Sequence, residues 1–308
     1  MIEILALTKY YGNLAALVDL NLSINAGEIF GFIGPNGAGK TTTMRILATL
    51  LEPSSGTASI NGVNVLRDGK QVRRMVGYMP DFMGVYDDLK VFEYLEFFAA
   101  AFSIERSRRK SVVEGVLELT DLNSKKTATV DSLSRGMQQR LGLARVLIHD
   151  PKVLILDEPA SGLDPRARIE MRVLLRELKT MGKTIMISSH ILSELEEMCD
   201  HMGIIEHGRL IFSGTMEEIR RKMGLSNKIR VKVADRQEQA VLILQALPQV
   251  QEVQVNGDQI QVSFRDGAAP DGVIARTLVQ NNFEVLSLVP EQIKLDDAFL
   301  QLTKGLVH

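Results

Sequence analysis

GEIFGFIGPNGAGKTT, residues 27–42, decides the fold of this chain. Its first half is an apolar run of strand length, which ends in a glycine-rich loop and passes into a helix from Thr41. KVLILDE at 152–158 and KTIMISSH at 183–190 are similar runs, as expected of strands buried on both faces of a sheet. Because such strands alternate with helical stretches up to about residue 215, the sequence predicts an α/β fold with a mostly parallel sheet.

The glycine-rich loop fits the phosphate-loop pattern of nucleoside triphosphatases. Glycines allow backbone N–H groups to surround phosphates, the helix N-terminus adds a positive dipole end, and Lys40 brings a positive charge to the β and γ oxygens. Thr41 is expected to ligate magnesium, and Thr42 is expected to touch the phosphates. The predicted phosphate-binding residues are Gly34, Pro35, Asn36, Gly37, Ala38, Gly39, Lys40, Thr41 and Thr42.

Two adjacent carboxylates end the apolar run VLILDEP at 153–159. Asp157 is placed to hold magnesium, directly or through water. Glu158 points to the other side of the strand end, where it can polarise the attacking water. A solvated acidic turn before Pro159 is the alternative that these residues leave open when taken by themselves.

The segment LSRGMQQR at 133–140 resembles the signature of the ABC ATPases, and it lies between the phosphate loop and the two carboxylates as that family requires. The rest of the family's pattern is also met, with Tyr11 before Gly12, SGLDP at 161–165, and His190 after a strand. The chain therefore resembles an ATP-binding subunit of an exporter-like, ABC-2 type transporter with a small C-terminal accessory domain. This resemblance implies a P-loop ABC ATPase domain, ATP hydrolysis, and ATP and Mg²⁺ as cofactors.

The same resemblance implies roles for individual residues. Tyr11 would stack on the adenine ring, although an aromatic side chain at the edge of the core remains the alternative. His190 would contact the γ-phosphate and hold the attacking water in line with Glu158. Glu158, His190 and Lys40 would be the catalytic residues.

The resemblance further implies a second copy of the ATPase subunit, expected to form a homodimer around two ATP molecules. Ser134, Gly136 and Gln138 would then bind the ATP held by the partner. Asp164 would lie at the interface of the two copies and help to pass information between their sites.

Asp81 departs from the family pattern, because VGYMPDF at 76–82 has this aspartate where a glutamine is usual. The carboxylate can still meet magnesium or a water, so Asp81 joins Thr41 and Asp157 as a candidate metal ligand. It is shorter than glutamine, lacks the amide donor and adds negative charge near the metal. A role in capping a turn is the alternative.

The composition excludes several classes of protein. The chain has 36 basic and 38 acidic residues, so it shows no basic excess and no nucleic-acid partner is expected. A single cysteine, Cys199, allows no internal disulfide and fits a reducing cytoplasm. Because no apolar run reaches the length of a membrane-spanning helix, we expect a peripheral protein on the cytoplasmic face of the membrane, held there by transmembrane permease subunits.

Two domains are predicted, an ABC ATPase domain at 1–224 with a helical insertion at about 89–147, and an accessory α+β domain at 228–308. The second domain reads as strand, helix, hairpin, helix and strand, which is the order of a ferredoxin-like fold. Its end, LDDAFLQLT at 295–303, resembles exporter subunits. Whether this domain regulates, supports dimerisation or caps the sheet stays open.

The sequence therefore predicts an ATPase that drives transport through separate transmembrane subunits. Export is the expected direction. A soluble ABC ATPase that remodels nucleic-acid or ribosomal complexes is the second interpretation, but the single ATPase unit and the short interval before the signature disfavour it. A catalytically silent binding subunit is disfavoured because Lys40, Glu158 and His190 are all present.

Overall fold

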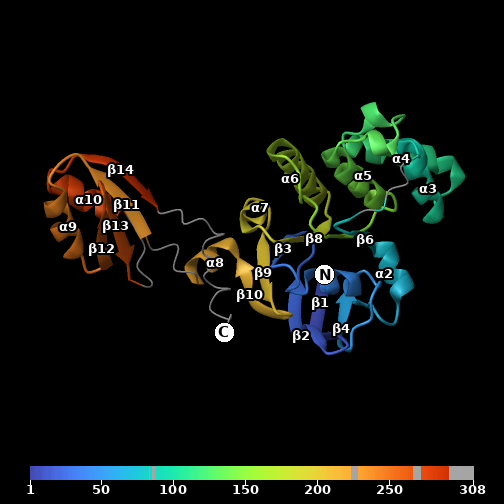
Figure 1. Ribbon diagram of the computed structural model, residues 1–308, viewed down its shortest axis with the longest axis horizontal. Coiled ribbons are helices and arrows are strands. Elements are labelled where there is room, and N and C mark those ends of the chain that lie inside the picture. Colours follow the sequence, from blue (N-terminus) through green and yellow to red (C-terminus); the bar gives the residue numbers. More distant parts are fainter. Residues whose placement is uncertain (83, 85–87, 223–227, 266–271, 291–308) are drawn as a thin grey trace. The chain divides into compact units, whose positions relative to one another are not determined.

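The computed structural model describes residues 1–82, 84, 88–222, 228–265 and 272–290 (Figure 1). Its contacts divide the chain into two compact units, Met1–Thr215 and Met216–His308. The helix α8, Met216–Lys222, falls in the second unit. The boundary predicted at 224–228 lies almost wholly outside the described residues.

The main sheet of the first unit has six strands in the order β10-β9-β3-β8-β7-β6. Its pairs are parallel except for β9 with β10, which confirms the predicted mostly parallel sheet. The apolar runs of the sequence form β3, β7 and β8, whose side chains are all buried because helices or other strands cover both faces. The six strands are β3 (Ile29–Ile33), β6 (Val76–Met79), β7 (Val153–Leu156), β8 (Thr184–Ser189), β9 (His201–Glu206) and β10 (Arg209–Thr215).

A second sheet, which was not predicted, is antiparallel throughout and has the order β2-β1-β4-β5. Side chains from this sheet, from the main sheet and from α1 share one hydrophobic core, and each large aliphatic side chain buried there contributes about 1.5–3 kcal/mol. This core fixes the N-terminal strands against the phosphate loop. The strands are β1 (Ile2–Tyr11), β2 (Leu14–Ile24), β4 (Ser55–Ile60) and β5 (Val63–Asn64).

Helices account for most of the segment between β6 and β7, where the sequence predicts a helical insertion. In Figure 1, α3, α4 and α5 form a group of their own beside the sheet, and they contact one another. Among the described residues, no helix is both long enough and apolar enough to cross a membrane. The helices of the first unit are α1 (Lys40–Leu47), α2 (Gly69–Met75), α3 (Val91–Ala101), α4 (Arg106–Leu119), α5 (Arg135–Leu147), α6 (Pro165–Thr180) and α7 (Leu192–Glu196), with short 3₁₀ turns η1 (Asn123–Lys125) and η2 (Val130–Ser132).

The second unit contains a four-stranded antiparallel sheet in the order β12-β13-β11-β14, which is the strand order of a ferredoxin-like fold. Alternate residues of β11 are buried against α9 and α10, so this unit has a hydrophobic core of its own. The segment 295–303 lies outside the described residues. The elements are β11 (Lys228–Val233), α9 (Gln237–Gln245), β12 (Val250–Asn256), β13 (Gln259–Phe264), α10 (Val273–Gln280) and β14 (Val285–Pro290).

Candidate active site

The loop between β3 and α1 requires glycine at two positions. A Cβ on Gly34 would lie 2.3 Å from the carbonyl oxygen of Ile205, and one on Gly39 would lie 2.7 Å from the carbonyl oxygen of Ala16. Gly39 also has φ 110°, a conformation that side chains other than hydrogen rarely allow. The loop can therefore turn tightly enough to present its N–H groups at the start of α1.

The remaining loop residues differ in their exposure. Gly34, Ala38 and Gly39 are buried under neighbouring strands, whereas the tip of the loop is exposed. The exposed tip and the half-buried first turn of α1 are where a phosphate chain can reach the backbone and the hydroxyl groups. The tip residues are Pro35, Asn36 and Gly37, and the half-buried hydroxyl residues are Thr41 and Thr42.

Lys40 is 6% exposed, and its ammonium group is held by three groups. Nζ donates to the carbonyl oxygen of Gly34 at 2.6 Å and to that of Pro35 at 3.3 Å. It also lies 3.5 Å from Oε1 of Glu158. The buried positive charge is thus compensated within the chain by the carboxylate that follows β7, two strands away from β3 in the sheet.

Asp157 and Glu158 follow β7 directly, as expected from the sequence. Asp157 is 1% exposed, its N–H donates to the carbonyl oxygen of Met79 at 2.8 Å, and its Oδ1 accepts from the hydroxyl of Ser188 at 2.6 Å. Glu158 has φ 51°, a left-handed conformation that is uncommon for a residue with a side chain. Its N–H donates to the same Ser188 oxygen at 2.9 Å.

His190 follows β8 and reaches the Glu158 carboxylate, with 2.9 Å between Nδ1 and Oε2. Parallel strands end at the same edge of a sheet, and for this reason residues far apart in the sequence meet here. Lys40, Glu158 and His190 form one contact cluster beside Asp157. Three of the predicted catalytic or metal-binding segments are thus brought together.

Asp81 lies close enough to this cluster for the charges of the cluster to change the pKa of its carboxyl group. Partial burial raises the pKa of the Asp81 carboxyl, and the negative charges of Asp157 and Glu158 raise it further, against smaller opposing effects from Arg135 and His190. Among the described residues, no three His, Cys, Asp or Glu side chains form a group that could hold a metal ion, so a divalent cation would also need ligands from bound phosphates or water. The residues from 83 to 87 that follow are mostly outside the described part of the chain.

Other predicted site residues have their contacts elsewhere on the surface. Tyr11 ends β1, is 45% exposed, and has Lys9 Nζ 5.4 Å from the centre of its ring. Ser134 is the exposed N-cap of α5, where its hydroxyl accepts from the N–H of Met137. Gly136 and Gln138 are half-buried in the first turns of that helix.

Asp164 is the exposed N-cap of α6, and its carboxylate accepts from the N–H of Ala167 at 2.9 Å. Next to it, Gly162 has φ 66°, and a Cβ there would lie 2.2 Å from the guanidinium carbon of Arg135. The start of the signature helix is therefore in contact with the SGLDP segment of the same chain. No role was predicted for Arg135, although a charged residue inside the signature was a visible signal.

Ser188 was also missed. A hydroxyl two residues before His190, directly after the apolar run Ile185–Ile187, was the available signal, because residues at this spacing share one face of a strand. Only the structure brings that hydroxyl to both Asp157 and Glu158.

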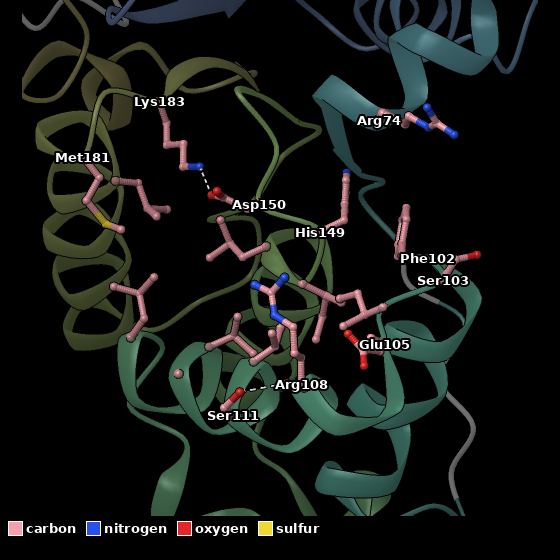
Figure 2. Close-up of a pocket in the computed structure, with 18 residues that line it drawn as sticks. Arg74, Phe102, Ser103, Glu105, Arg108, Ser111, His149, Asp150, Met181 and Lys183 are labelled. Atoms are coloured by element: carbon pink, nitrogen blue, oxygen red, sulfur yellow. Dashed lines mark hydrogen bonds and ion pairs between the residues drawn. The ribbon is translucent and has the colours of Figure 1, made fainter.

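A separate cavity of about 750 Å³ lies where α4, the end of α5, the end of α6 and the end of α2 meet (Figure 2). Apolar side chains contribute much of its lining, and Arg74, Arg108 and Lys183 line it beside the acidic Glu105 and Asp150. Lys183 pairs with Asp150, whereas within the described residues neither arginine has an ion pair. The lining is completed by Phe102, Ser103, Ile104, Ser111, Val112, Gly115, Val116, Leu119, Leu147, Ile148, His149, Leu178 and Met181.

His149 forms one wall of this cavity and stacks on Phe102 with 4.0 Å between the ring centres. Its Nε2 lies 3.0 Å from the carbonyl oxygen of Val76, and its buried Nδ1 has no hydrogen-bond partner among the described residues. Burial lowers the pKa of His149, so the ring stays neutral to lower pH than a solvated histidine.

The active-site geometry supplies the groups that ATP hydrolysis needs. The loop N–H groups and Lys40 can bind phosphates, Thr41 and Asp157 supply a hydroxyl and a carboxylate suited to magnesium, and Glu158 can accept a proton from water.

Comparison with known proteins agrees with this chemistry. Residues 17–161 match the family model described as ABC transporter. The bacitracin transport ATP-binding protein of Bacillus licheniformis is 36% identical over 97% of this chain and 96% of its own length. A Nod factor export ATP-binding protein of Ralstonia nicotianae is 33% identical over 98% of this chain and 94% of its own length.

Solved structures agree as well. The structure of an ATP-binding subunit of an ABC transporter is 32% identical, covers 73% of this chain and 94% of that chain, and superposes with a TM-score of 0.66. A dimeric bacterial ABC transporter cassette shares the fold, with 24% identity, 70% of this chain covered and a TM-score of 0.64. The chain therefore belongs to the ABC transporter family, as an ATP-binding subunit of the ABC ATPase type.

Proposed function

We propose that this chain is the ATP-hydrolysing motor of an exporter and acts through separate transmembrane subunits. The observation that carries this proposal is the cluster of Lys40, Glu158 and His190 beside the buried Asp157, at the ends of three parallel strands. A relative that is named for Nod factor export supports the outward direction, and one that is named for bacitracin transport supports a role in transport.

ATP binding would begin at the phosphate loop. Lys40 donates to carbonyl oxygens of its own loop and lies near Glu158, so the phosphates of ATP would compete with these acceptors for the ammonium group. The loop N–H groups and the N-terminus of α1 would add further positive potential. Tyr11, exposed at the end of β1, offers an aromatic face on which adenine can stack.

Hydrolysis requires a group that polarises water and a group that orients it. Glu158 is proposed as the base, because its carboxylate is held between Lys40 and His190. His190 is proposed to contact the γ-phosphate through the ring nitrogen that Glu158 does not occupy. Lys40 would stabilise the charge on the phosphoryl group during transfer.

Magnesium is the cation that we propose for the site. Asp157 uses Oδ1 to accept from Ser188, which leaves Oδ2 for a cation. Thr41 in the first turn of α1 would supply a hydroxyl ligand, and Asp81 would contribute directly or through water. When bound, magnesium neutralises charge on the β and γ oxygens.

A second copy of the chain would complete each site. The exposed N-cap Ser134, with Gly136 and Gln138, is proposed to bind the ATP of the partner, since a free helix N-terminus favours phosphate. Asp164 caps the neighbouring helix α6 and is proposed to lie at the interface. The dimeric cassette that shares this fold supports such an arrangement.

The transmembrane partner is proposed to engage the helical insertion at the cavity of Figure 2. Apolar lining side chains and two arginines, Arg74 and Arg108, for which the described residues show no ion pair, suit a short partner helix that carries both apolar and acidic side chains. The segment 81–88, half of which lies outside the described residues, is proposed to contribute to the same contact. This contact would hold the chain peripherally on the cytoplasmic face of the membrane.

The accessory unit is proposed to be a separate domain at 228–308, after an ATPase domain at 1–224. Its own hydrophobic core supports independent folding. Regulation, dimerisation and capping remain the roles between which experiment must decide.

Purification of the chain from its own cells in mild detergent, followed by mass spectrometry, tests the transporter assignment. A membrane protein in stoichiometric amount is expected, whereas ribosomal or DNA-associated proteins without one would support the soluble alternative. Arg108→Glu should reduce recovery of the membrane protein, while Arg67→Glu, an exposed arginine outside the cavity, should not. In a separate assay, Lys40→Ala should abolish tight ATP binding, and retained binding would exclude its phosphate role.

A further inference from the structure

Ser188 lies in β8 and is fully buried. Burial of a hydroxyl in a central strand is unfavourable unless its hydrogen-bonding capacity is used. Here the capacity is used on the two acidic residues of the active site. Oγ lies 2.6 Å from Oδ1 of Asp157 and 2.9 Å from the backbone nitrogen of Glu158.

The direction of both hydrogen bonds follows from the chemistry of the groups. An ionised carboxylate only accepts, and a backbone N–H only donates. The single proton of Ser188 must therefore go to Asp157, and a lone pair of the same oxygen must accept from Glu158. One hydroxyl is committed to both residues at the same time.

These two contacts control different features of the site. The bond to Oδ1 fixes the rotamer of Asp157, so that Oδ2 is the oxygen available to a cation. The bond to the N–H of Glu158 helps to hold its left-handed backbone conformation, φ 51°, which side chains disfavour. That conformation directs the carboxylate toward Lys40 and His190.

We propose that Ser188 is a positioning residue for ATP hydrolysis, which aligns Asp157 for magnesium and Glu158 for the attacking water through one hydroxyl group. It does not touch substrate itself. The inference rests on the proposed roles of Asp157 and Glu158.

The test compares Ser188→Ala with Thr184→Val in the purified full chain. Thr184 is a matched control because it is also buried in β8 and accepts from the N–H of Gly27 at 2.8 Å, at the opposite end of the strand. ATP binding is measured with a fluorescent ATP analogue in EDTA and across a Mg²⁺ titration, and hydrolysis is measured across the same titration.

Ser188→Ala is expected to raise the Mg²⁺ concentration for half-maximal nucleotide binding by about 10- to 100-fold, the usual cost of losing a group that orients a metal ligand. Its kcat should also fall, while affinity for nucleotide in EDTA stays at the parent value. Ser188→Thr, which keeps the hydroxyl, should recover much of both losses. Thr184→Val should change stability without shifting the Mg²⁺ dependence.

Asp157→Asn separates failure of the inference from failure of the proposed function. If Asp157→Asn shifts the Mg²⁺ dependence and Ser188→Ala does not, the positioning role of Ser188 is wrong and the metal site stands. If neither variant shifts it, the metal role of Asp157 is wrong, and the inference falls with it. A Ser188→Ala variant that loses nucleotide binding equally in EDTA and in Mg²⁺ would also overturn the inference.

Discussion

Replacement of Glu158 by glutamine should separate ATP binding from hydrolysis. Oε1 of Glu158 lies 3.5 Å from Nζ of Lys40, and both side chains are nearly buried. At an effective dielectric constant of about 20, two unit charges at this distance attract by about 5 kcal/mol, and desolvation of both groups offsets much of it. Because Lys40 also donates to two loop carbonyls, we expect the free energy of unfolding without nucleotide to fall by about 1–3 kcal/mol.

With ATP present, the same substitution removes a carboxylate that competes with the phosphates for Lys40. In Glu158→Gln, Lys40 no longer has to leave a carboxylate in order to meet the phosphates, so ATP should bind at least as tightly as in the parent. Hydrolysis should fall by about 10²- to 10⁴-fold, because the proposed base is lost. The variant should therefore stay in an ATP-bound closed dimer.

The assay is thermal unfolding with and without Mg²⁺ and ATP, together with phosphate release and size-exclusion chromatography. We expect a lower Tm without nucleotide, a larger rise in Tm on adding ATP, and a dimer peak. Glu28→Gln is the control, because Glu28 is a buried carboxylate that contacts Asn25 and His201 instead of the site. Hydrolysis at the parent rate, or a variant that remains monomeric with ATP, would refute the role of Glu158.

Three further predictions concern other parts of the first unit. Gly34→Ala places a Cβ 2.3 Å from the carbonyl oxygen of Ile205, so we expect a loss of about 1–3 kcal/mol in urea unfolding and weaker ATP binding; unchanged urea midpoints would contradict the close approach. Burial lowers the pKa of His149 below its ordinary value of 6.5. As pH decreases below about 6.5, His149 is therefore protonated in the unfolded chain before it is protonated in the folded chain, and the stability of the fold should fall. Urea midpoints of His149→Leu should depend less on pH between about 5 and 7 than those of the parent. The pKa of Asp81 is raised in the folded chain, so ionisation of its carboxyl group should lower the stability of the metal-free fold as pH rises. In thermal unfolding with EDTA, Asp81→Gln should lose less stability than the parent as pH rises. An identical pH profile for parent and variant would exclude this destabilisation by Asp81.

Local patterns in the sequence were sufficient for much of the architecture. The three apolar runs predicted β3, β7 and β8 because a strand buried on both faces leaves continuous hydrophobicity. In the second unit, the turn at Asn256-Gly257-Asp258 divides two strands, and Gly257 has φ 64° as such a turn requires. The antiparallel sheet of β1, β2, β4 and β5 was not predicted, because its pairings join segments whose alternation is irregular and interrupted by register shifts.

The active site, too, could be predicted only in part from the sequence. The chemical groups of the site could be predicted from the sequence, since Asp157, Glu158 and His190 follow recognisable strands, Lys40 ends the phosphate loop, and each motif specifies residue type and spacing. It could not determine which of these groups contact one another. That depends on the order β3-β8-β7 in the sheet, a long-range property that local patterns do not encode.

The supporting contacts depend on how the strands and helices pack in three dimensions. The hydroxyl of Ser188 meets Asp157 and Glu158 because β7 and β8 are neighbouring parallel strands, and Arg135 meets Gly162 because α5 begins beside the segment that leads into α6. Motifs record the groups that touch the substrate, whereas the groups that orient them are selected by packing. Packing brings together residues that are far apart in the sequence, and for that physical reason these orienting contacts are visible only in the folded structure.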